Sequence, residues 1–290
     1  MSKIEWTDKT WNPIRGCSRV SAGCENCYAE KMAFRFSGPG QPYEGTVEKT
    51  SKGPRWTGKI GVNRKDINAP HSWKKPRMVF VNSMSDLFHP NVQKDVFSEI
   101  MDVMMITERH TYQILTKRPE NIVDFVSKTR WDWGVTFPDH MWIGTSVESN
   151  AVKNRIAHLI TVPAKVRFLS VEPMLGPLDI EDYLDTGRIH WVIMGGESGP
   201  KARYCDIGWK YDLIASCDKY KVPVFVKQLG SNFIDSYGGD ENLVYVTQDV
   251  SGVKIEHPNT TYRDMSYKGN DISKWPAPLQ RQEFPMEEVI

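Results

Sequence analysis

The chain has 290 residues, of which 40% are hydrophobic and 25% are charged, and its formal net charge is +1. This size suits one large domain or one domain with an extension, and no apolar stretch approaches the roughly 18 residues that a membrane span needs. Because the N-terminus also lacks the charged-then-apolar layout of a signal peptide, we expect a soluble cytoplasmic protein without a membrane partner.

Three of the five cysteines lie close together near the N-terminus. Cys17, Cys24 and Cys27 form a CxxxxxxCxxC run, and a short strand is expected just before it, at residues 9–12. An odd number of cysteines, three of them crowded, fits metal-binding thiols in a reducing compartment better than a disulfide framework. The sequence therefore predicts a metal-bound site on this loop.

Two kinds of metal site fit this run. Three thiolates leave one iron of a cubane iron-sulfur cluster without a protein ligand, and that iron can bind a small molecule. Radical S-adenosylmethionine (SAM) enzymes use this arrangement, usually with CxxxCxxC spacing. The alternative is a zinc knuckle completed by a remote ligand such as His71 or His89. The cysteines alone leave both open, and Cys205 and Cys217 are expected to be ordinary semi-buried thiols.

The segment 49–77 is strongly basic, with nine Lys or Arg residues against the single acid Asp66. Glycine and proline are scattered through it, so we expect a long irregular excursion. A basic stretch with interspersed aromatic rings can hold phosphates while the rings stack on bases, although a solvated surface loop is the plainer explanation. The candidate nucleic-acid-binding residues are Lys49, Lys52, Arg55, Trp56, Arg64, Lys65, Trp73, Lys74 and Lys75.

The body of the chain alternates short apolar runs with helical patterns. Runs that start roughly 25 to 35 residues apart leave room for one helix per crossover, which is typical of a parallel α/β sheet. The expected strands are residues 78–82, 111–115, 141–143, 166–169, 191–194 and 222–226. The expected helices are residues 91–109, 120–128, 151–160 and 208–220.

Polar residues follow every one of these expected strands. In a closed or partly closed parallel barrel the carboxyl ends of the strands meet at one rim, where such enzymes build their sites. Helix caps and turns explain a single polar end better than six in succession, so we expect a shared site. Glu172 precedes Pro173, which disfavours helix at Glu172, and Gly195 and Gly196 allow the backbone to approach a ligand closely.

Beyond Gly230 the chain changes character, because residues 231–290 contain few periodic apolar runs. One short strand is expected there, at residues 244–246. Too few large apolar residues remain for a separate core. We therefore expect a barrel core over residues 1–230, with the basic insertion at about residues 45–77, and a C-terminal extension over residues 231–290 packed on it.

Eight strings, running in order from about Trp6 to Gly230, share a family resemblance. They are TWNP with the following GC, GCENCYA, VNSMSDLF, LTKRP, SVE, RFLSVEP, GGESGP and VKQLG. Together they resemble the phage-associated three-cysteine-motif family, a radical-SAM-like group without an assigned activity. The resemblance implies a partial (β/α) barrel of the TIM type, a 4Fe-4S cluster on Cys17, Cys24 and Cys27, and SAM as cofactor. The cysteine spacing agrees with this family's own, which favours the cluster over zinc.

The resemblance also implies roles for the residues at the strand ends. An electron from the reduced cluster, delivered by a flavodoxin- or ferredoxin-type reductant, would cleave SAM to methionine and a 5'-deoxyadenosyl radical that abstracts hydrogen from the substrate. The expected cofactor-binding residues are Tyr28, Asn82, Ser83, Ser85, Thr116, Ser146, Glu148, Gly195 and Gly196. The expected catalytic or substrate-contacting residues are Glu172, Glu197 and Lys227.

Phage association and the basic segment favour DNA or a modified nucleotide as substrate. One possible reaction is a radical isomerisation or rearrangement in the hypermodification of a DNA base such as thymine, and a second is the lyase reaction that repairs pyrimidine photoproducts. Either enzyme would act on a flipped or single-stranded base. From a different class, the chain could be a non-catalytic cluster- or zinc-bearing nucleic-acid-binding module in phage defence or counter-defence. A phage-encoded protein would work in the cytoplasm of the host, and the oligomeric state is not predicted.

Overall fold

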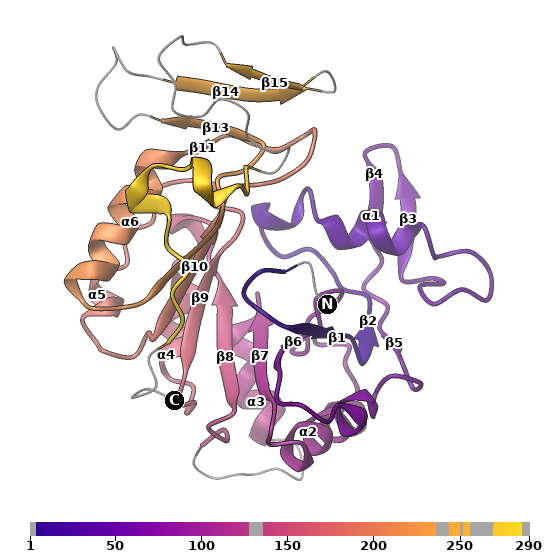
Figure 1. Ribbon diagram of the computed structural model, residues 1–290. Coiled ribbons are helices and arrows are strands. Elements are labelled where there is room, and N and C mark those ends of the chain that lie inside the picture. The colour runs from indigo at the N-terminus through magenta and orange to yellow at the C-terminus, as the bar shows by residue number, and fades with distance from the viewer. Residues whose placement is uncertain (1–3, 128–135, 236–243, 250–251, 256–268, 286–290) are drawn as a thin grey trace. The chain divides into compact units, whose positions relative to one another are not determined.

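The computed structural model describes residues 4–127, 136–235, 244–249, 252–255 and 269–285. Its main sheet has seven parallel strands, hydrogen-bonded in the order β1-β6-β7-β8-β9-β10-β12 (Figure 1). They are β1 (Lys9–Trp11), β6 (Met78–Val81), β7 (Thr111–Thr116), β8 (Met141–Ser146), β9 (Arg167–Val171), β10 (Trp191–Gly195) and β12 (Val224–Gln228). The predicted α/β fold of the partial TIM-barrel type is confirmed, and each predicted barrel strand is present.

The chain divides into two compact units, which we describe separately. Unit 1 consists mainly of Met1–Thr145 with His158–Arg167, and unit 2 of Ser146–Ala157 with Phe168–Val289. Each unit is therefore made of more than one stretch of the chain. The predicted organisation, a barrel core with a boundary after Gly230, stays a prediction.

The helices of unit 1 cover the sheet with apolar faces. They include α2 (Lys94–Ile106), as predicted, and a short 3-10 turn η3 (Pro119–Asn121) that leads into α3 (Ile122–Ser127). Phe97 of α2 and Phe125 of α3 have ring centroids 5.2 Å apart, and Phe88 packs against both. This aromatic cluster holds both helices against the strands, because burying such rings accounts for much of the stability of a core.

The basic segment is more regular than the sequence predicted. Instead of one irregular excursion it contains a hairpin of β3 (Val47–Thr50) and β4 (Gly53–Trp56), the strand β5 (Gly61–Val62) paired with β2 (Ile14–Arg15), and a 3-10 turn η2 (Ala69–Ser72). The hairpin forms because Gly53, at φ 111°, adopts a backbone conformation that other residues avoid. Val47 and Trp56 are paired across the hairpin and are both buried.

Unit 2 adds α5 (Glu181–Leu184) and α6 (Ile207–Lys219), while η4 (Asn150–Val152) is followed by α4 (Asn154–Ile160), which runs on into unit 1. A second sheet has the order β11-β13-β14-β15, with β11 (Cys205–Asp206), β13 (Asn232–Asp235), β14 (Val244–Asp249) and β15 (Gly252–Ile255). The predicted helices over 151–160 and 208–220 and the predicted strand at 244–246 are confirmed.

The segment 269–285 lies against β12 within unit 2. It contains the 3-10 turns η6 (Ile272–Lys274) and η7 (Ala277–Leu279). The backbone N–H of Val226 donates to the carbonyl of Arg281 at 2.8 Å, and that of Glu283 donates to the carbonyl of Val224 at 3.0 Å. Trp275 and Leu279 are buried. These contacts satisfy the edge of β12, which would otherwise leave donors and acceptors unpaired.

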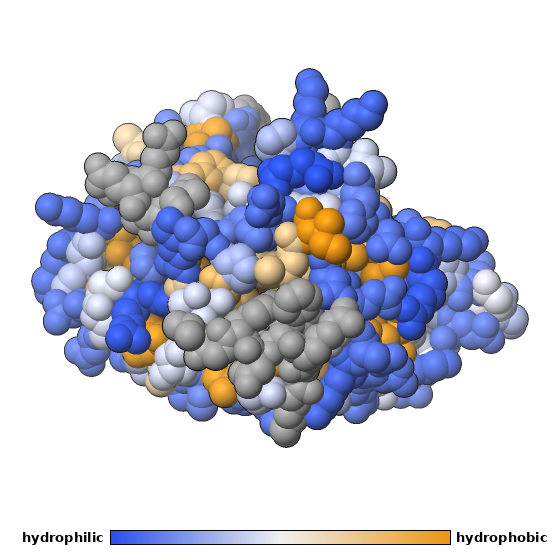
Figure 2. All heavy atoms as spheres, turned by 90° about the horizontal axis from the view of Figure 1, so that it is seen from below, coloured by the Kyte–Doolittle hydropathy of each residue, from blue (hydrophilic) through white to orange (hydrophobic). Residues whose placement is uncertain are grey.

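Within the residues that the structure describes, none of the helices has both the length and the apolar character of a membrane span. Figure 2 shows that hydrophilic residues cover most of the face that it draws, with hydrophobic residues in small groups between them. The most exposed large hydrophobic side chains are Ile106 of α2, at 68%, and Val123 of α3, at 59%. Single exposed side chains of this kind are ordinary on a protein surface.

Candidate functional site

The three N-terminal cysteines lie on one loop of unit 1. Cys24 ends the 3-10 turn η1 (Ala22–Cys24), and Cys27 is the residue before α1 (Tyr28–Phe34). All three thiols are free and partly exposed. Cys17 and Cys27 pack against a small hydrophobic cluster made of Ala29, Ala33, Val47, Trp56 and Met84. The loop is therefore anchored both to α1 and to the β3–β4 hairpin.

Burial controls the ionisation of Cys17 and Cys27. It raises the pKa of Cys17 to about 12, and the neighbouring Asp86 carboxylate adds to that rise, while Arg118 opposes it. Burial likewise raises the pKa of Cys27. Both thiols are protonated at neutral pH in the metal-free chain, so a metal that binds them must displace their protons.

Arg118, two residues after β7, joins the cysteine loop to the ends of two strands. Its Nη1 donates to Asp86 Oδ2 at 2.8 Å and to Cys17 Sγ at 3.8 Å, and its Nη2 donates to the Ser18 carbonyl at 2.8 Å. Arg118 is 4% exposed and Asp86 5%. Asp86 Oδ1 also accepts from the hydroxyl of Thr116 at 2.7 Å. A buried ion pair persists only when its remaining hydrogen-bonding atoms are satisfied, as they are here.

Among the described residues, neither histidine named for the zinc alternative joins the three cysteines in one group of ligands. In the described ranges, no group of three or more His, Cys, Asp or Glu side chains is placed to hold a metal ion, whereas zinc needs four ligands within about 2.0 to 2.3 Å. His89 uses both ring nitrogens inside the chain, Nε2 with Ser18 Oγ at 2.9 Å and Nδ1 as acceptor from the Asn91 N–H at 3.1 Å. His71 is exposed on the surface.

An iron-sulfur cluster makes a different demand on the same loop. Its cysteine sulfurs ligate separate irons of one cube, so they lie farther apart than the ligands of a single ion. Cys24 and Cys27 lie one turn apart, and the Cys27 N–H donates to the Cys24 carbonyl at 3.4 Å. Hydrogen bonds to the sulfurs tune such clusters, and Arg118 supplies one to Cys17. The three cysteines therefore fit a cluster with three cysteine ligands.

Three of the predicted cofactor-binding hydroxyls have partners within the protein. Ser83 Oγ donates to the side chain of Asn12 at 3.2 Å, Ser85 Oγ donates to the carbonyl of Ile14 at 3.0 Å, and Thr116 donates to Asp86. These bonds tie the loop after β6 to the N-terminal segment and to β7. Their cofactor contacts stay a prediction, and the structure gives each hydroxyl a positioning role.

Asn82, the first residue after β6, differs from these hydroxyls. It is 3% exposed, and neither atom of its carboxamide has a hydrogen-bond partner among the described residues. Its φ of 61° lies in the left-handed region that residues other than glycine seldom adopt. An unsatisfied buried polar group costs about 1 to 3 kcal/mol. Among the predicted cofactor-binding residues, Asn82 thus has a side chain whose missing hydrogen bonds a bound ligand would supply.

Tyr28 begins α1 directly after Cys27. Its hydroxyl donates to the carbonyl of Ser83 at 2.7 Å, while the residue remains 57% exposed. The hydroxyl thus fixes the ring over the loop that follows β6. Its partner Ser83 is the residue next to Asn82 in the sequence. An aromatic face held in this way is available to a flat ligand, which agrees with the cofactor contact predicted for Tyr28 but does not test it.

In unit 2, Glu148 and Ser146 are held by Arg155, a residue that the sequence analysis did not single out. Arg155 Nη1 donates to Glu148 Oε2 at 3.0 Å and to the carbonyl of Ser146 at 2.9 Å. All three residues are buried. The sequence signal for this pair was the single arginine in the expected helix over residues 151–160. A buried glutamate needs a cation near it.

The three predicted catalytic residues have different partners within the protein. Glu172 and Lys227 do pair, with Oε1 and Nζ 3.0 Å apart. Glu197 is instead 8% exposed and accepts three hydrogen bonds from Arg203, at 2.7, 2.8 and 3.0 Å. Its carboxylate is occupied by that guanidinium and backbone N–H. The roles of Glu172, Glu197 and Lys227 at a shared site stay predictions.

The two glycines at the end of β10 serve the chain's own packing. A Cβ on Gly195 would lie 2.6 Å from Glu172 Oε1, and one on Gly196 would lie 2.0 Å from the carbonyl oxygen of Leu229. The contact at Gly196 is with backbone and excludes any side chain, whereas at Gly195 the flexible Glu172 side chain would have to shift. The close approach that the sequence analysis assigned to a ligand is made at Gly196 by the backbone of the neighbouring segment.

The candidate nucleic-acid-binding residues divide into exposed cations and covered rings. Trp56 is 6% exposed inside the hydrophobic cluster, so its predicted stacking on a base is corrected. Trp73 is half-buried, with Lys9 Nζ 4.1 Å from the ring centroid and His110 packed beside it. Arg64 pairs with Glu99. The remaining candidates, all exposed, are Lys49, Lys52, Arg55, Lys65, Lys74 and Lys75.

A family model described as a protein of unknown function (DUF5131) matches residues 1–274. The chain belongs to this family. No curated protein matches the DUF5131 chain.

Two solved structures of spore photoproduct lyase are similar to the DUF5131 chain at 14% sequence identity, and this similarity concerns the fold alone. The first is a double mutant with bound AdoMet and dinucleoside spore photoproduct, with a TM-score of 0.38. The match covers 73% of the DUF5131 chain and 50% of the mutant's chain. A complex with dinucleoside spore photoproduct has a TM-score of 0.37 and covers 82% of this chain and 68% of its own. The DUF5131 chain thus spans half the length of the first structure.

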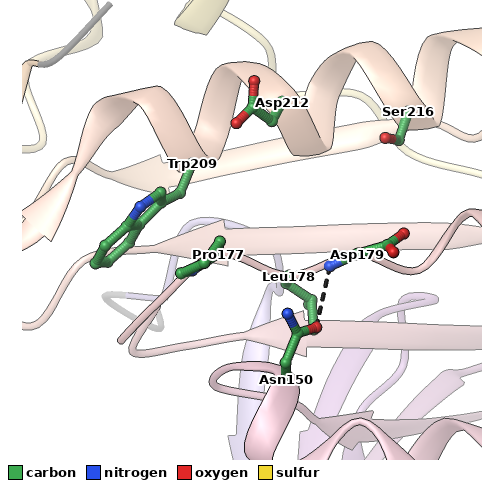
Figure 3. Close-up of a pocket in the computed structure, with 7 residues that line it drawn as sticks. All are labelled: Asn150, Pro177, Leu178, Asp179, Trp209, Asp212 and Ser216. Carbon is green, nitrogen blue, oxygen red and sulfur yellow. Dashed lines mark hydrogen bonds between the residues drawn. The ribbon is translucent and has the colours of Figure 1, made fainter.

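A pocket of about 250 Å³ lies within unit 2, apart from every predicted site residue. It is lined by Asn150, Pro177, Leu178, Asp179, Trp209, Asp212 and Ser216. Figure 3 shows Trp209, Asp212 and Ser216 along α6, with Asn150 and Asp179 on the opposite side. Asn150 Oδ1 accepts from the Asp179 N–H at 3.1 Å, so part of the polar lining is already satisfied within the DUF5131 chain.

Proposed function

We propose that this chain is a radical SAM enzyme in which Cys17, Cys24 and Cys27 hold a 4Fe-4S cluster. The observation that carries the proposal is the contact of Arg118 with Cys17, because it places a charged N–H donor on a thiol of a three-cysteine loop. When bound, the reduced cluster supplies the electron that cleaves SAM into methionine and a 5'-deoxyadenosyl radical. The radical-SAM-like resemblance of the sequence motifs supports the same assignment.

The chain's own residues position the reactants. Arg118 fixes the loop and places positive charge beside the sulfur of Cys17, which lowers the cost of holding thiolates in a buried site. The carboxamide of Asn82 offers one acceptor and two donors, which match the amino and carboxylate groups of SAM. Tyr28, held through its hydroxyl, would contact the adenine with its exposed ring.

We further propose that the substrate is a DNA base or a modified nucleotide. The β3–β4 hairpin carries Lys49, Lys52 and Arg55, all exposed. This hairpin lies against the cysteine loop, because Trp56 and Cys17 share one hydrophobic cluster and the Gly58 N–H donates to the Cys17 carbonyl at 3.1 Å. Cations beside the reactive loop would hold a phosphate backbone there.

The resemblance to the phage-associated family favours a rearrangement of a hypermodified thymine as the reaction. The alternative to this rearrangement is cleavage of a pyrimidine photoproduct. A flipped or single-stranded base is required in either case, since the target carbon is hidden in a duplex.

The deciding experiment is anaerobic reconstitution with iron and sulfide. We expect about four irons per chain and, after addition of SAM and a reductant, formation of 5'-deoxyadenosine. Cys17→Ala, Cys24→Ala and Cys27→Ala should abolish both, whereas the control Cys217→Ala should retain both. Iron without SAM cleavage would indicate a binding module, and stoichiometric zinc without iron would overturn the assignment.

The substrate is tested separately with the reconstituted protein. Single-stranded DNA that carries either an amino-acid-decorated thymine or a pyrimidine photoproduct is incubated with SAM, reductant and enzyme. Mass spectrometry of the digested nucleosides then distinguishes a rearranged base, which keeps its mass, from a photoproduct cleaved to its component bases. Consumption of neither by an enzyme that cleaves SAM would remove DNA bases from the proposal.

A further inference from the structure

Unit 2 contains a lysine and a cysteine that are both completely buried and in direct contact. Lys210 Nζ lies 2.6 Å from Cys205 Sγ, and both residues are 0% exposed. Lysine is almost never fully buried without a partner, because its charge is costly to remove from water. The sequence analysis expected Cys205 to be an ordinary semi-buried thiol, and the structure corrects that expectation.

The nitrogen of Lys210 lies within hydrogen-bonding distance of the sulfur of Cys205. The two atoms that would react are therefore held side by side before any chemistry begins.

The local fold explains why these two groups meet. Cys205 opens β11, which leads directly into α6, where Lys210 lies in the first turns. Asp206 caps this helix, because its Oδ1 accepts from the Gly208 N–H at 2.8 Å. Cys205 is also paired with the buried Phe233 of β13. The strand pairing and the helix cap hold both side chains in place from either end.

We propose that Cys205 and Lys210 form a covalent sulfur–nitrogen bond when the protein meets peroxide, which makes this pair an oxidative modification site separate from the cysteine loop. In the first step hydrogen peroxide oxidises the Cys205 thiol to a sulfenic acid and is reduced to water. In the second step the Lys210 amine attacks that sulfur, the S–O bond breaks, the S–N bond forms, and a second water leaves. Sulfenic acids undergo the same condensation with backbone nitrogen.

The reaction balances as one thiol, one amine and one peroxide giving one sulfenamide and two waters. Sulfur loses the two electrons that the peroxide gains. Two equivalents of an external thiol reverse it, because they return the thiol and the amine and form one external disulfide. The modification is therefore reversible.

The burial of the pair decides the product. Peroxide reaches Cys205 only when the short β11 segment opens locally. Once it closes again, the sulfenic acid lies against the amine of Lys210 and away from water and further peroxide. Intramolecular attack is then favoured over oxidation to the sulfinic acid, because the two reacting atoms are already in contact.

The test is peptide mapping of the full chain after treatment with hydrogen peroxide. Trypsin cleaves after Arg203, Lys210 and Lys219, and a bond at Lys210 blocks the middle cleavage. We expect the peptide Tyr204–Lys219 to appear with the mass of two hydrogens fewer and to disappear after treatment with a thiol reductant. Because Cys217 lies in the same peptide, the mapping is repeated on Cys217→Ala, which cannot form a disulfide there.

Two variants complete the design. Lys210→Arg removes the amine, so Cys205 should instead accumulate as a sulfenic acid that a dimedone-type probe labels. Cys205→Ser should give neither product. If these variants do not fold, the mapping of the unmodified chain and of Cys217→Ala still decides. Sulfinic acid at Cys205 with normal cleavage at Lys210 overturns the proposal. The uncleaved peptide carrying one added oxygen overturns the direct S–N bond in favour of an oxygen-bridged link.

Discussion

Arg118 Nη1 lies 3.8 Å from Cys17 Sγ and 2.8 Å from Asp86 Oδ2, so one guanidinium joins the cysteine loop to the loop that follows β6. The ion pair is nearly as buried as the core, with side chains 5% and 7% exposed. Because Asp86 also accepts hydrogen bonds from Thr116 and from the backbone N–H groups of Phe88 and Lys117, the carboxylate organises the ends of β6 and β7 together. The thiol and the strand ends are therefore positioned by one network.

Removing the guanidinium should destabilise unit 1 strongly. Arg118→Gln leaves the Asp86 charge buried and uncompensated, which typically costs about 3 to 5 kcal/mol. We expect the urea midpoint of the metal-free protein to fall accordingly. The control is Arg64→Gln, which breaks the exposed pair with Glu99 and should cost at most about 1 kcal/mol. Equal effects of the two substitutions would mean that Arg118 does not carry the network.

Asn82→Gly separates ligand binding from folding. Glycine accepts the φ of 61° at this position without strain, and the substitution removes an unsatisfied carboxamide. The free energy of unfolding should therefore hold or rise, by a few tenths to about 1 kcal/mol. SAM affinity, measured by equilibrium dialysis with the reconstituted protein, should fall roughly tenfold or more, since a hydrogen bond to a charged group contributes about 1.5 to 3 kcal/mol.

The matched control is Lys221→Gly, because Lys221, at φ 55°, is the other non-glycine residue with a left-handed backbone among the described residues. It should give a similar gain in stability without a change in SAM affinity. A stable Asn82→Gly protein that binds SAM as tightly as the parent would show that Asn82 is not a SAM contact.

The architecture was predictable because it depends on local patterns. Six apolar runs at regular spacing fix a parallel sheet with helical crossovers, and each became a strand at the expected place. The stripe of apolar residues over 91–109 likewise became α2. Such periodic patterns record which face of an element is buried, and this is the information that the sequence carries most directly.

The partners of polar side chains were less predictable, because they depend on contacts between distant segments. Glu197 looked like a rim carboxylate, yet Arg203, six residues later, neutralises it. Gly196 looked like a ligand contact, yet the backbone of Leu229 fills that space. The prediction for Trp56 was wrong for a related reason. Trp56 alternates with Arg55 along β4, so the cation faces water and the ring faces the core, which only the pairing of the hairpin could reveal.

The cations of the hairpin give a second test of the substrate. Replacing Lys49, Lys52 and Arg55 by Gln should weaken binding of single-stranded DNA and flatten its dependence on salt, by roughly 0.7 units of the logarithmic slope for each phosphate that the protein no longer neutralises. Fluorescence anisotropy over a range of salt concentrations measures both quantities. Lys165→Gln, at an exposed lysine paired with Asp139, is the control that should change neither.

Trp56→Ala should behave differently from these substitutions. Because its ring is buried against α1, we expect a loss of stability of about 3 to 5 kcal/mol rather than a selective loss of affinity for single strands. DNA affinity unchanged by the three hairpin substitutions would remove the phosphate contacts from the proposal.

His89 should make the stability of the metal-free protein depend on pH. Burial lowers its pKa to about 4, and the charge of Arg118 lowers it further while Asp86 opposes the shift. The folded chain therefore resists a proton that the unfolded chain accepts near pH 6.5. Stability contributed by the neutral ring is complete above about pH 6.5 and is lost as the pH falls towards 4. At about 1.4 kcal/mol per pKa unit the loss is on the order of 3 kcal/mol.

Urea unfolding at pH 7 and pH 4.5 measures this loss of stability, and comparison of parent with variant cancels the contribution of the carboxylates. His89→Gln should flatten the pH dependence, whereas His71→Gln, at an exposed ring, should leave it unchanged. The same slope in parent and His89→Gln would show that the His89 ring is protonated as readily in the folded chain as in the unfolded one.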